Sequence, residues 1–301
     1  MAYRAFEEFC KLNKIEYKKN EPMKSHTSFK IGGAADLFLC VSSSEELKKV
    51  IIEAEKQAIP YFILGKGSNL LVSDKGIEGI VISLLGTDNI SVEGNSIIAD
   101  AGASLTAVCN VALENGLTGL EFAYGIPGTV GGALYMNAGA YGGEMRDVVS
   151  EAEYIDKNGN IDTILLSQME LGYRTSLFKK GEKIITKVTF KLDIGEKDEI
   201  KAKMTDFMGR RKDKQPLEYP SAGSTFKRPE GYFAGALIEQ NGLKGRCVGS
   251  AQVSEKHAGF VINTGDATCG DVLSLIEEIK ETVFKADGVK LEPEVIFVGR
   301  K

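Results

Sequence analysis

The feature that most constrains this chain is a glycine-rich stretch near its middle, Gly125–Gly143. Seven of its residues are glycine, one is proline and none is charged. A flexible linker would be polar, whereas Val130, Leu134 and Met136 favour burial. Glycine in a packed segment indicates backbone at positive φ, or backbone too close to a neighbour to leave room for a Cβ. The stretch is therefore predicted to be a structured loop that contacts a bound group.

A phosphate-bearing cofactor suits such a loop, because main-chain N–H groups bind anions without help from cationic side chains. A second loop of similar character lies upstream, at Gly65–Val72. Two such loops in one chain predict a site for a large dinucleotide. The common nucleotide-binding motifs do not fit. Leu70 stands where the dinucleotide fingerprint has its third glycine, and neither loop ends in the Gly-Lys-Ser/Thr of a P-loop.

Both loops resemble the FAD loops of the UDP-N-acetylenolpyruvoylglucosamine reductase family. Further similarity follows along the chain in family order, at residues 26–33, 172–176, 220–227, 251–260 and 291–295. Each motif is weak alone, but their joint occurrence in this order is specific and covers nearly the whole chain. Family members are flavoenzymes of early peptidoglycan synthesis. Their FAD-binding fold is the one shared by vanillyl-alcohol oxidase and p-cresol methylhydroxylase.

Hairpin signals mixed with helical periodicity predict an α+β chain rather than a regular βαβ array. The resemblance implies an FAD-binding fold of the vanillyl-alcohol oxidase type in two lobes, plus a smaller α+β substrate-binding C-terminal domain. The predicted ranges are an N-terminal helical segment at 1–28, an FAD-binding domain at 29–195 with lobes at 29–85 and 86–195, and the substrate domain at 196–301.

Local patterns place the main elements. Apolar residues at helical spacing predict helices over 3–14, 44–58 and 270–286. Ser43 and Glu46 have the spacing of a capping box. Turn residues between alternating segments predict hairpins around 94–95 and 157–160. Further strands are expected at 36–41, 61–64, 79–83, 183–192 and 295–298.

The resemblance implies three catalytic residues. The family reduces an enolpyruvyl ether with a hydride from FAD, which NADPH has previously reduced. Hydride addition leaves negative charge that spreads into the substrate carboxylate, and a guanidinium such as that of Arg174 can stabilise it. Ser224 matches the proton donor and Glu294 the acidic residue of the family. A carboxyl group in a partly apolar wall is expected to have a raised pKa.

Each of these three residues also has a plainer explanation when taken alone. Arg174 could form a surface ion pair, although its neighbours are largely apolar. Ser224, in a Gly-Ser-Thr sequence, has the character of a turn residue or helix N-cap. Glu294 could lie on an exposed edge strand, where charged residues are common.

The family motifs also imply binding residues. FAD, bound noncovalently, is assigned to the two loops through Gly65, Gly67, Ser68, Asn69, Leu70, Gly125, Gly128, Thr129, Gly132 and Ala133. The substrate, and NADPH in turn, are assigned to Tyr173, Lys214, Lys227 and Arg228, since charge-assisted donors recognise phosphate strongly. The two histidines and the cysteines show no metal-ligand spacing, so no metal is expected.

Bulk properties limit the alternatives. Five cysteines form no Cys-x-x-Cys pair, which predicts reduced thiols in a cytoplasmic protein. No apolar run approaches the roughly 20 residues of a membrane helix, and a net charge of −5 argues against nucleic-acid binding. A monomer is expected. The rival functions are another flavoenzyme of this fold and a non-catalytic nucleotide-binding module.

One departure from longer family members concerns the cover of the active site. The interval Phe178–Ile194 is short and reads mostly as strand, whereas longer members insert a loop there whose tyrosine covers the substrate. The chain therefore resembles the compact subtype. Which element closes over its substrate is left open.

Overall fold

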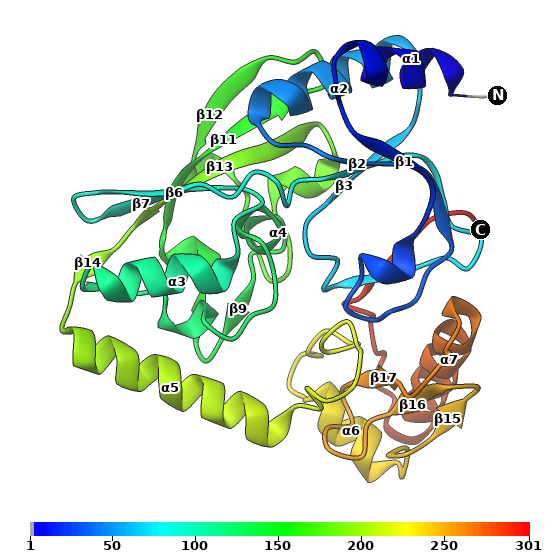
Figure 1. Cartoon of the computed structure of the whole chain (residues 1–301). Coiled ribbons are helices and arrows are strands. Elements are labelled where there is room, and N and C mark those ends of the chain that lie inside the picture. The colour runs from blue at the N-terminus through cyan, green and yellow to red at the C-terminus, as the bar shows by residue number, and fades with distance from the viewer. Residues whose placement is uncertain (1–2) are drawn as a thin grey trace. The chain divides into compact units, whose positions relative to one another are not determined.

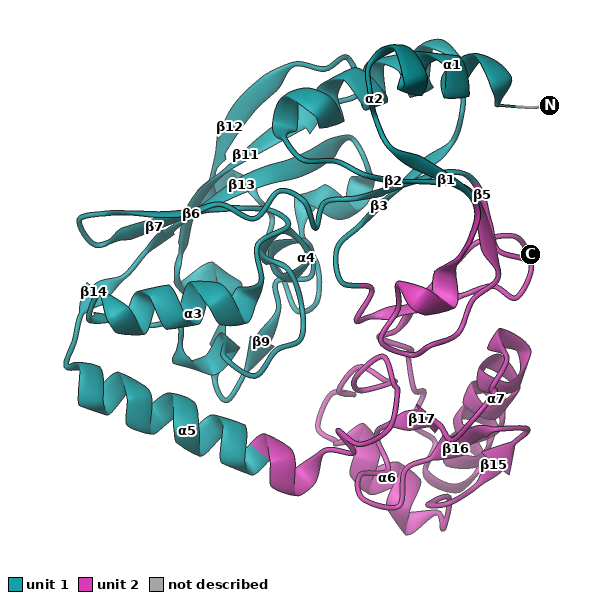
Figure 2. Ribbon diagram, in the orientation of Figure 1, with its two compact units in different colours: residues 1–19, 37–66, 79–210 teal, residues 20–36, 67–78, 211–301 magenta. Residues whose placement is uncertain are grey.

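The structure is a computed structural model that describes residues 3–301, and it divides into two compact units. Unit 1 comprises residues up to 19, 37–66 and 79–210, and unit 2 comprises 20–36, 67–78 and 211–301 (Figure 2). Two short N-terminal segments thus join the C-terminal residues in unit 2. The contiguous domain ranges expected from the sequence stay a prediction.

Unit 1 is built around a five-stranded antiparallel sheet (Figure 1). Its strand order is β12-β11-β13-β7-β6, with bounds β12 Ile161–Leu165, β11 Val149–Asp156, β13 Lys183–Lys191, β7 Ser96–Asp100 and β6 Ile90–Glu93. Both predicted hairpins are confirmed as the pairs β6–β7 and β11–β12. Gly94 adopts φ +61° in the first turn, where a side chain would be strained.

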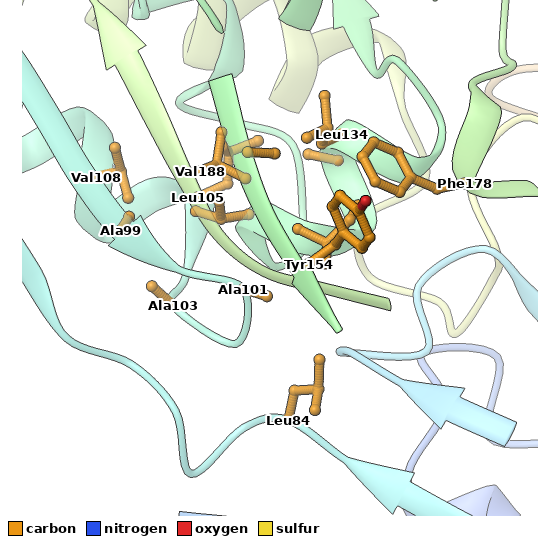
Figure 3. Close-up of a cluster of buried hydrophobic side chains, with 14 of the residues drawn as sticks. Leu84, Ala99, Ala101, Ala103, Leu105, Val108, Leu134, Tyr154, Phe178 and Val188 are labelled. Atoms are coloured by element: carbon orange, nitrogen blue, oxygen red, sulfur yellow. The ribbon is translucent and has the colours of Figure 1, made fainter. Parts of the chain in front are cut away.

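The helices of unit 1 bury their apolar faces against its sheets. The predicted N-terminal helices are confirmed as α1 Arg4–Leu12 and α2 Ser44–Lys56; the others are α3 Leu105–Glu114, α4 Val130–Tyr135 and, continuing into unit 2, α5 Lys197–Lys214. Helix α4 comes from the glycine-rich stretch and packs on β13 and β7. Figure 3 shows the side chains of Ala101, Leu134 and Val188 in the core there.

Half of the predicted capping box at α2 is confirmed. The Ser43 hydroxyl accepts a hydrogen bond from the Glu46 N–H. The Glu46 carboxylate accepts from the N–H and hydroxyl of Ser42, at 2.8 and 2.6 Å, rather than from the Ser43 N–H. The spacing of Ser43 and Glu46 correctly predicted the start of the helix. The Glu46 carboxylate binds Ser42 instead of Ser43 because Ser42 offers it two donors, the N–H and the hydroxyl.

A second sheet has the order β1-β2-β5-β3, with β3 parallel to β5. The bounds are β1 Tyr17–Pro22, β2 Ala34–Cys40, β5 Ile77–Ser83 and β3 Tyr61–Leu64. Smaller pairings are β8 Leu117–Thr118 with β14 Asp193–Ile194, and β9 Gly139–Ala140 with β10 Gly143–Glu144. Short 3-10 turns occupy 23–25, 121–123, 145–147, 166–168 and 177–180.

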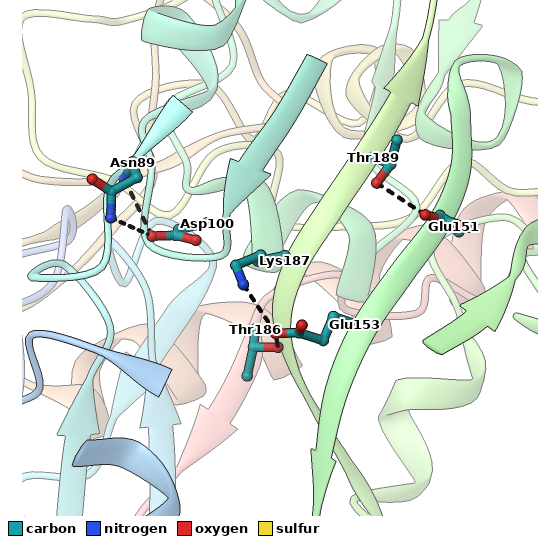
Figure 4. A network of polar contacts seen from close by, with 7 residues as sticks. All are labelled: Asn89, Asp100, Glu151, Glu153, Thr186, Lys187 and Thr189. Atoms are coloured by element: carbon teal, nitrogen blue, oxygen red, sulfur yellow. Dashed lines mark hydrogen bonds and ion pairs between the residues drawn. The ribbon is translucent and has the colours of Figure 1, made fainter. Parts of the chain in front are cut away.

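Polar side chains support the five-stranded sheet (Figure 4). The buried hydroxyl of Thr186 donates to the Glu153 carboxylate at 2.7 Å, and the Lys187 ammonium lies 3.5 Å from the same oxygen. At the end of β7, the Asp100 carboxylate accepts from the side-chain amide of Asn89 at 2.8 Å. Buried polar atoms are thereby satisfied next to the irregular register of β11 and β13, where an unpaired group would be costly.

Unit 2 carries a second core under two helices, α6 Ala234–Gln240 and α7 Cys269–Asp287. Its three-stranded antiparallel sheet consists of β15 Cys247–Val248, β16 Ala251–Val253 and β17 Val261–Asn263. The predicted helix over 270–286 is confirmed, with a capping box at Thr268 and a left-handed Gly288 at its end. The final strand, β18 Ile296–Val298, pairs in parallel with β4 Leu70–Val72.

All five cysteines are free, as their spacing predicted. Burial raises the pKa of the Cys10 and Cys109 thiols to about 12 and that of Cys269 to about 11, so these thiols stay protonated at neutral pH. None of the helices between residues 3 and 301 combines the length and apolar character that crossing a membrane requires.

Candidate functional site

The two glycine-rich loops meet within unit 1. A Cβ on Gly65 would lie 2.5 Å from the hydroxyl oxygen of Thr129, so only glycine lets the first loop approach the second this closely. The neighbouring Lys66 ammonium donates to the Ser104 hydroxyl at 3.1 Å, and Ser104 forms an isolated β-bridge with Thr129. Loops separated by some sixty residues of sequence thus come together, as a single cofactor site requires.

The amides at the start of α4 are already engaged. Those of Val130 and Gly131 donate to carbonyls of the 101–103 segment, and those of Gly132 and Ala133 donate to the Thr129 hydroxyl and carbonyl oxygens. Gly132 and Ala133 therefore have no N–H left for a phosphate, and a cofactor would contact Gly132 through its exposed Cα face. Within the described chain the N–H groups of Gly128 and Thr129 have no acceptor; Gly128 is half-buried and Thr129 buried, so the Gly128 N–H is the better placed of the two for an anion.

The rest of the first loop belongs to unit 2. Gly67 has φ +61°, and a Cβ there would collide with the carbonyl oxygen of His26. The side-chain amide of Asn69 donates to the carbonyl of Glu294 at 3.2 Å, and the Asn69 carbonyl accepts from the Ile296 N–H. A predicted cofactor loop and a predicted catalytic residue are thus joined directly.

Ser224 and Glu294 lie on adjacent extended segments of unit 2. The two segments bridge at Phe226 and Pro293, and the Glu294 N–H donates to the Thr225 carbonyl at 2.8 Å. Glu294 therefore stands opposite the residue next to Ser224. Ser224 is exposed and Glu294 half-buried, so the structure brings together the predicted proton donor and the predicted acid, separated by 70 residues of sequence.

A period-2 alternation of buried and exposed residues is only partly present around Glu294, which is half-buried, as are Ile296 and Val298. Leu291 and Val295 are buried, but Pro293 is exposed and the Phe297 side chain is 37% exposed. The strand begins only at Ile296, after Glu294, so the alternation does not extend through the whole segment.

Arg174 occupies a tight two-residue turn of unit 1. Gly172 and Thr175 exchange both main-chain hydrogen bonds across the turn. Arg174 itself has φ +54°, a left-handed conformation that costs a non-glycine residue of order 1–3 kcal/mol. Its guanidinium donates to the Gly139 carbonyl at 3.2 Å and lies 5.3 Å from the ring centre of Tyr173. Strain of this kind concentrates at functional sites, which favours a functional arginine over a surface ion pair.

The predicted substrate residues lie on both units. Tyr173 belongs to unit 1, while Lys214, at the end of α5, belongs to unit 2 with Lys227 and Arg228. The Lys227 ammonium pairs with Glu292 at 3.1 Å, and the Arg228 guanidinium sits 4.0 Å from the ring centre of Phe233. Among residues 3–301, no group of three or more His, Cys, Asp or Glu side chains is arranged to hold a metal ion.

His257 lies near Ser224, and the sequence did not single it out as a site residue. Its Nδ1 accepts from the Gly259 N–H at 3.1 Å, and burial lowers its pKa. A Cβ on Gly259 would lie 3.5 Å from the Ser224 hydroxyl and 2.9 Å from the His257 ring. Gly259 therefore lies between the side chains of Ser224 and His257. Only the family-like motif at 251–260 hinted at this placement.

We expect Gly67→Ala to yield protein with little or no bound flavin. Its Cβ would meet the His26 carbonyl and displace a loop predicted to hold FAD. Gly94→Ala is the matched control, because Gly94 has the same φ of +61° but nothing within 4 Å of the added Cβ. Flavin content is read from visible absorbance, and far-UV circular dichroism checks folding. A fully yellow Gly67→Ala protein would show that the loop does not bind the cofactor.

The chain is similar to known proteins over nearly its whole length. Residues 35–164 match the FAD binding domain family, and residues 215–298 match the C-terminal domain of UDP-N-acetylenolpyruvoylglucosamine reductase. The reductase of Caldanaerobacter subterraneus is 56% identical over 94% of this chain and 93% of its own, and that of Clostridium novyi 53% over 96% and 94%. The crystal structure of UDP-N-acetylenolpyruvylglucosamine reductase from Thermus caldophilus is 36% identical with a TM-score of 0.80, covering 94% of this chain and 98% of that one.

Proposed function

Because this chain belongs to the UDP-N-acetylenolpyruvoylglucosamine reductase family, we propose that Arg174, Ser224 and Glu294 carry out the family reaction in it. The protein is an FAD-dependent oxidoreductase that uses NADPH to reduce UDP-N-acetylenolpyruvoylglucosamine to UDP-N-acetylmuramate, a step of peptidoglycan synthesis. The observation that carries the assignment is 56% identity over nearly the full length of a named reductase.

The residue roles follow from the charge that the reaction creates. Bound FAD supplies the hydride chemistry between NADPH and the alkene. Arg174 holds the substrate carboxylate and stabilises the negative charge that develops there. Ser224 donates the proton that completes the reduction. Because a serine is a weak acid, it needs a neighbouring group to assist it, and Glu294, opposite Thr225 on the adjacent segment, is the carboxyl group placed to do so.

Binding roles are proposed for the remaining predicted residues. The N–H group of Gly128, which has no acceptor among the described residues, supports a pyrophosphate site, to which Thr129 and the loop from Gly65 to Leu70 contribute backbone. Gly125 and the exposed face of Gly132 would lie against FAD. The substrate diphosphate is assigned to Lys214, Lys227 and Arg228, and Tyr173 to contact with the flavin and the substrate.

We also propose that the protein works as a monomer in the cytoplasm. Its five free cysteines suit a reducing compartment.

The proposed function is tested by product analysis. Incubation with NADPH and UDP-N-acetylenolpyruvoylglucosamine is expected to consume both in equal amounts and to yield UDP-N-acetylmuramate, identified by mass, without oxygen uptake. NADPH oxidation that requires oxygen and leaves the enolpyruvyl nucleotide unchanged would identify an oxidase of this fold instead.

A further inference from the structure

Left-handed backbone gathers in two short segments of unit 1. Of the eight non-glycine residues with positive φ among those described, four lie at Asn137, Tyr141, Glu170 and Arg174. The segments touch, because the Arg174 guanidinium donates to the carbonyl of Gly139. Such conformations persist only where the surrounding structure holds them in place. Something in this region must therefore fix the turn that carries Arg174.

Asn137 makes the contacts that fix it. The residue is fully buried, with φ +42°. Its side-chain amide nitrogen donates to the carbonyl of Gly172 at 2.9 Å and to the carboxylate of Glu144 at 3.0 Å. Its side-chain oxygen accepts from the Arg146 N–H at 3.0 Å. The carboxamide thus uses both N–H donors and its oxygen, and it ties three segments of chain together.

Asn137 is linked to Arg174 in two ways, through the Arg174 turn and through the segment that carries Gly139. Gly172 is the first residue of the Arg174 turn, so Asn137 holds the main chain that carries the arginine. Gly139, which accepts from the guanidinium, follows Asn137 by two residues on the same segment. The turn is further secured by the Ser176 hydroxyl, which donates to the Tyr135 carbonyl at 2.7 Å.

We propose that Asn137 is a positioning residue that sets the place of the Arg174 guanidinium for catalysis. The inference rests on the catalytic role proposed for Arg174. The side chain must be an amide, because two of its three partners are acceptors. A carboxylate at this position would face the Glu144 carboxylate and the Gly172 carbonyl, and both contacts would become repulsive.

Two variants test the role of the Asn137 carboxamide separately from that of its left-handed backbone. Asn137→Gly accepts the left-handed conformation without strain but loses all three hydrogen bonds. Asn137→Asp keeps the shape and reverses two of them. Displacement of a positioned group by about 1 Å can lower a rate roughly 100-fold. We expect both variants to lower kcat by about that factor and to change KM far less, with flavin content and NADPH-driven flavin reduction close to wild type.

A double-mutant cycle with Arg174→Lys provides the decisive readout. If Asn137 acts through the guanidinium, Asn137→Gly/Arg174→Lys should be about as slow in substrate-driven flavin reoxidation as the slower single variant. Ile155→Ala is the stability control. It removes a fully buried side chain of β11 and is expected to lower Tm while keeping kcat near wild type.

The possible outcomes distinguish a failure of the role proposed for Asn137 from a failure of the role proposed for Arg174. Multiplying effects in the double variant, or an Asn137→Gly enzyme with wild-type kcat and a lowered Tm, would make Asn137 merely structural and leave the role of Arg174 intact. An Arg174→Lys enzyme with full turnover would instead overturn the role proposed for the arginine, and the positioning role with it.

Discussion

Ser224→Ala is expected to leave flavin reduction by NADPH near the wild-type rate and to slow reoxidation by the enolpyruvyl substrate about 100- to 10,000-fold, the usual worth of general acid catalysis. The two half-reactions differ because hydride transfer from NADPH to FAD requires no protonation of a substrate carbon. Stopped-flow absorbance under anaerobic conditions measures each separately. Ser224 is exposed, so the substitution is expected to leave folding intact.

Ser221→Ala provides the control for that prediction. Ser221 lies three residues upstream, and its main chain bridges Ile262 and accepts from the Ser28 hydroxyl at 2.7 Å. Its substitution should leave both half-reactions unchanged. Equal slowing of the two half-reactions by Ser224→Ala would mean that the serine is structural or binds both partners.

Arg174→Lys and Glu294→Gln are expected to depress turnover strongly while changing substrate dissociation constants modestly. Arg174 and Glu294 are proposed to act on the negative charge of the intermediate, which exists only between hydride transfer and protonation. Stabilising that charge lowers the barrier without tightening ground-state binding of the substrate. Lysine keeps the charge but loses the planar fork, and glutamine keeps the size but cannot transfer a proton. Dissociation constants follow from titrating the oxidised flavin spectrum. Arg210→Lys, at an exposed site of unit 1, is the control.

The pH dependence gives an independent readout for Glu294. If its carboxyl group titrates during the reaction, Glu294→Gln should remove or displace one limb of the pH–rate profile. Weaker substrate affinity with turnover preserved at saturation would show that Arg174 and Glu294 anchor the substrate rather than take part in catalysis.

Local sequence patterns predicted the helices and strands that are long enough to show a regular spacing of apolar residues. The helix α7, the hairpin β6–β7 and the strand β3 are confirmed with bounds close to those expected. The strands β15, β16 and β17 contain two or three residues each, too few for a pattern of alternation. The residues that bury β16 and β17 are distant in sequence, so no local window reports them.

The site was harder to predict because it depends on contacts between distant residues. Glycine content drew attention to both glycine-rich loops but did not show that they meet at Gly65 and Thr129. Nor did it show that the first amides of α4 are consumed by the 101–103 carbonyls and by Thr129. Asn137 was not singled out, since one asparagine within a glycine-rich stretch reads as an ordinary turn residue.

The most direct test of the central claim is an anaerobic titration of the purified flavoprotein. One equivalent of NADPH should bleach the flavin, and one equivalent of UDP-N-acetylenolpyruvoylglucosamine should then restore its colour as UDP-N-acetylmuramate appears in equal amount. A flavin that NADPH does not bleach, or whose colour returns only when oxygen is admitted, would contradict the assignment.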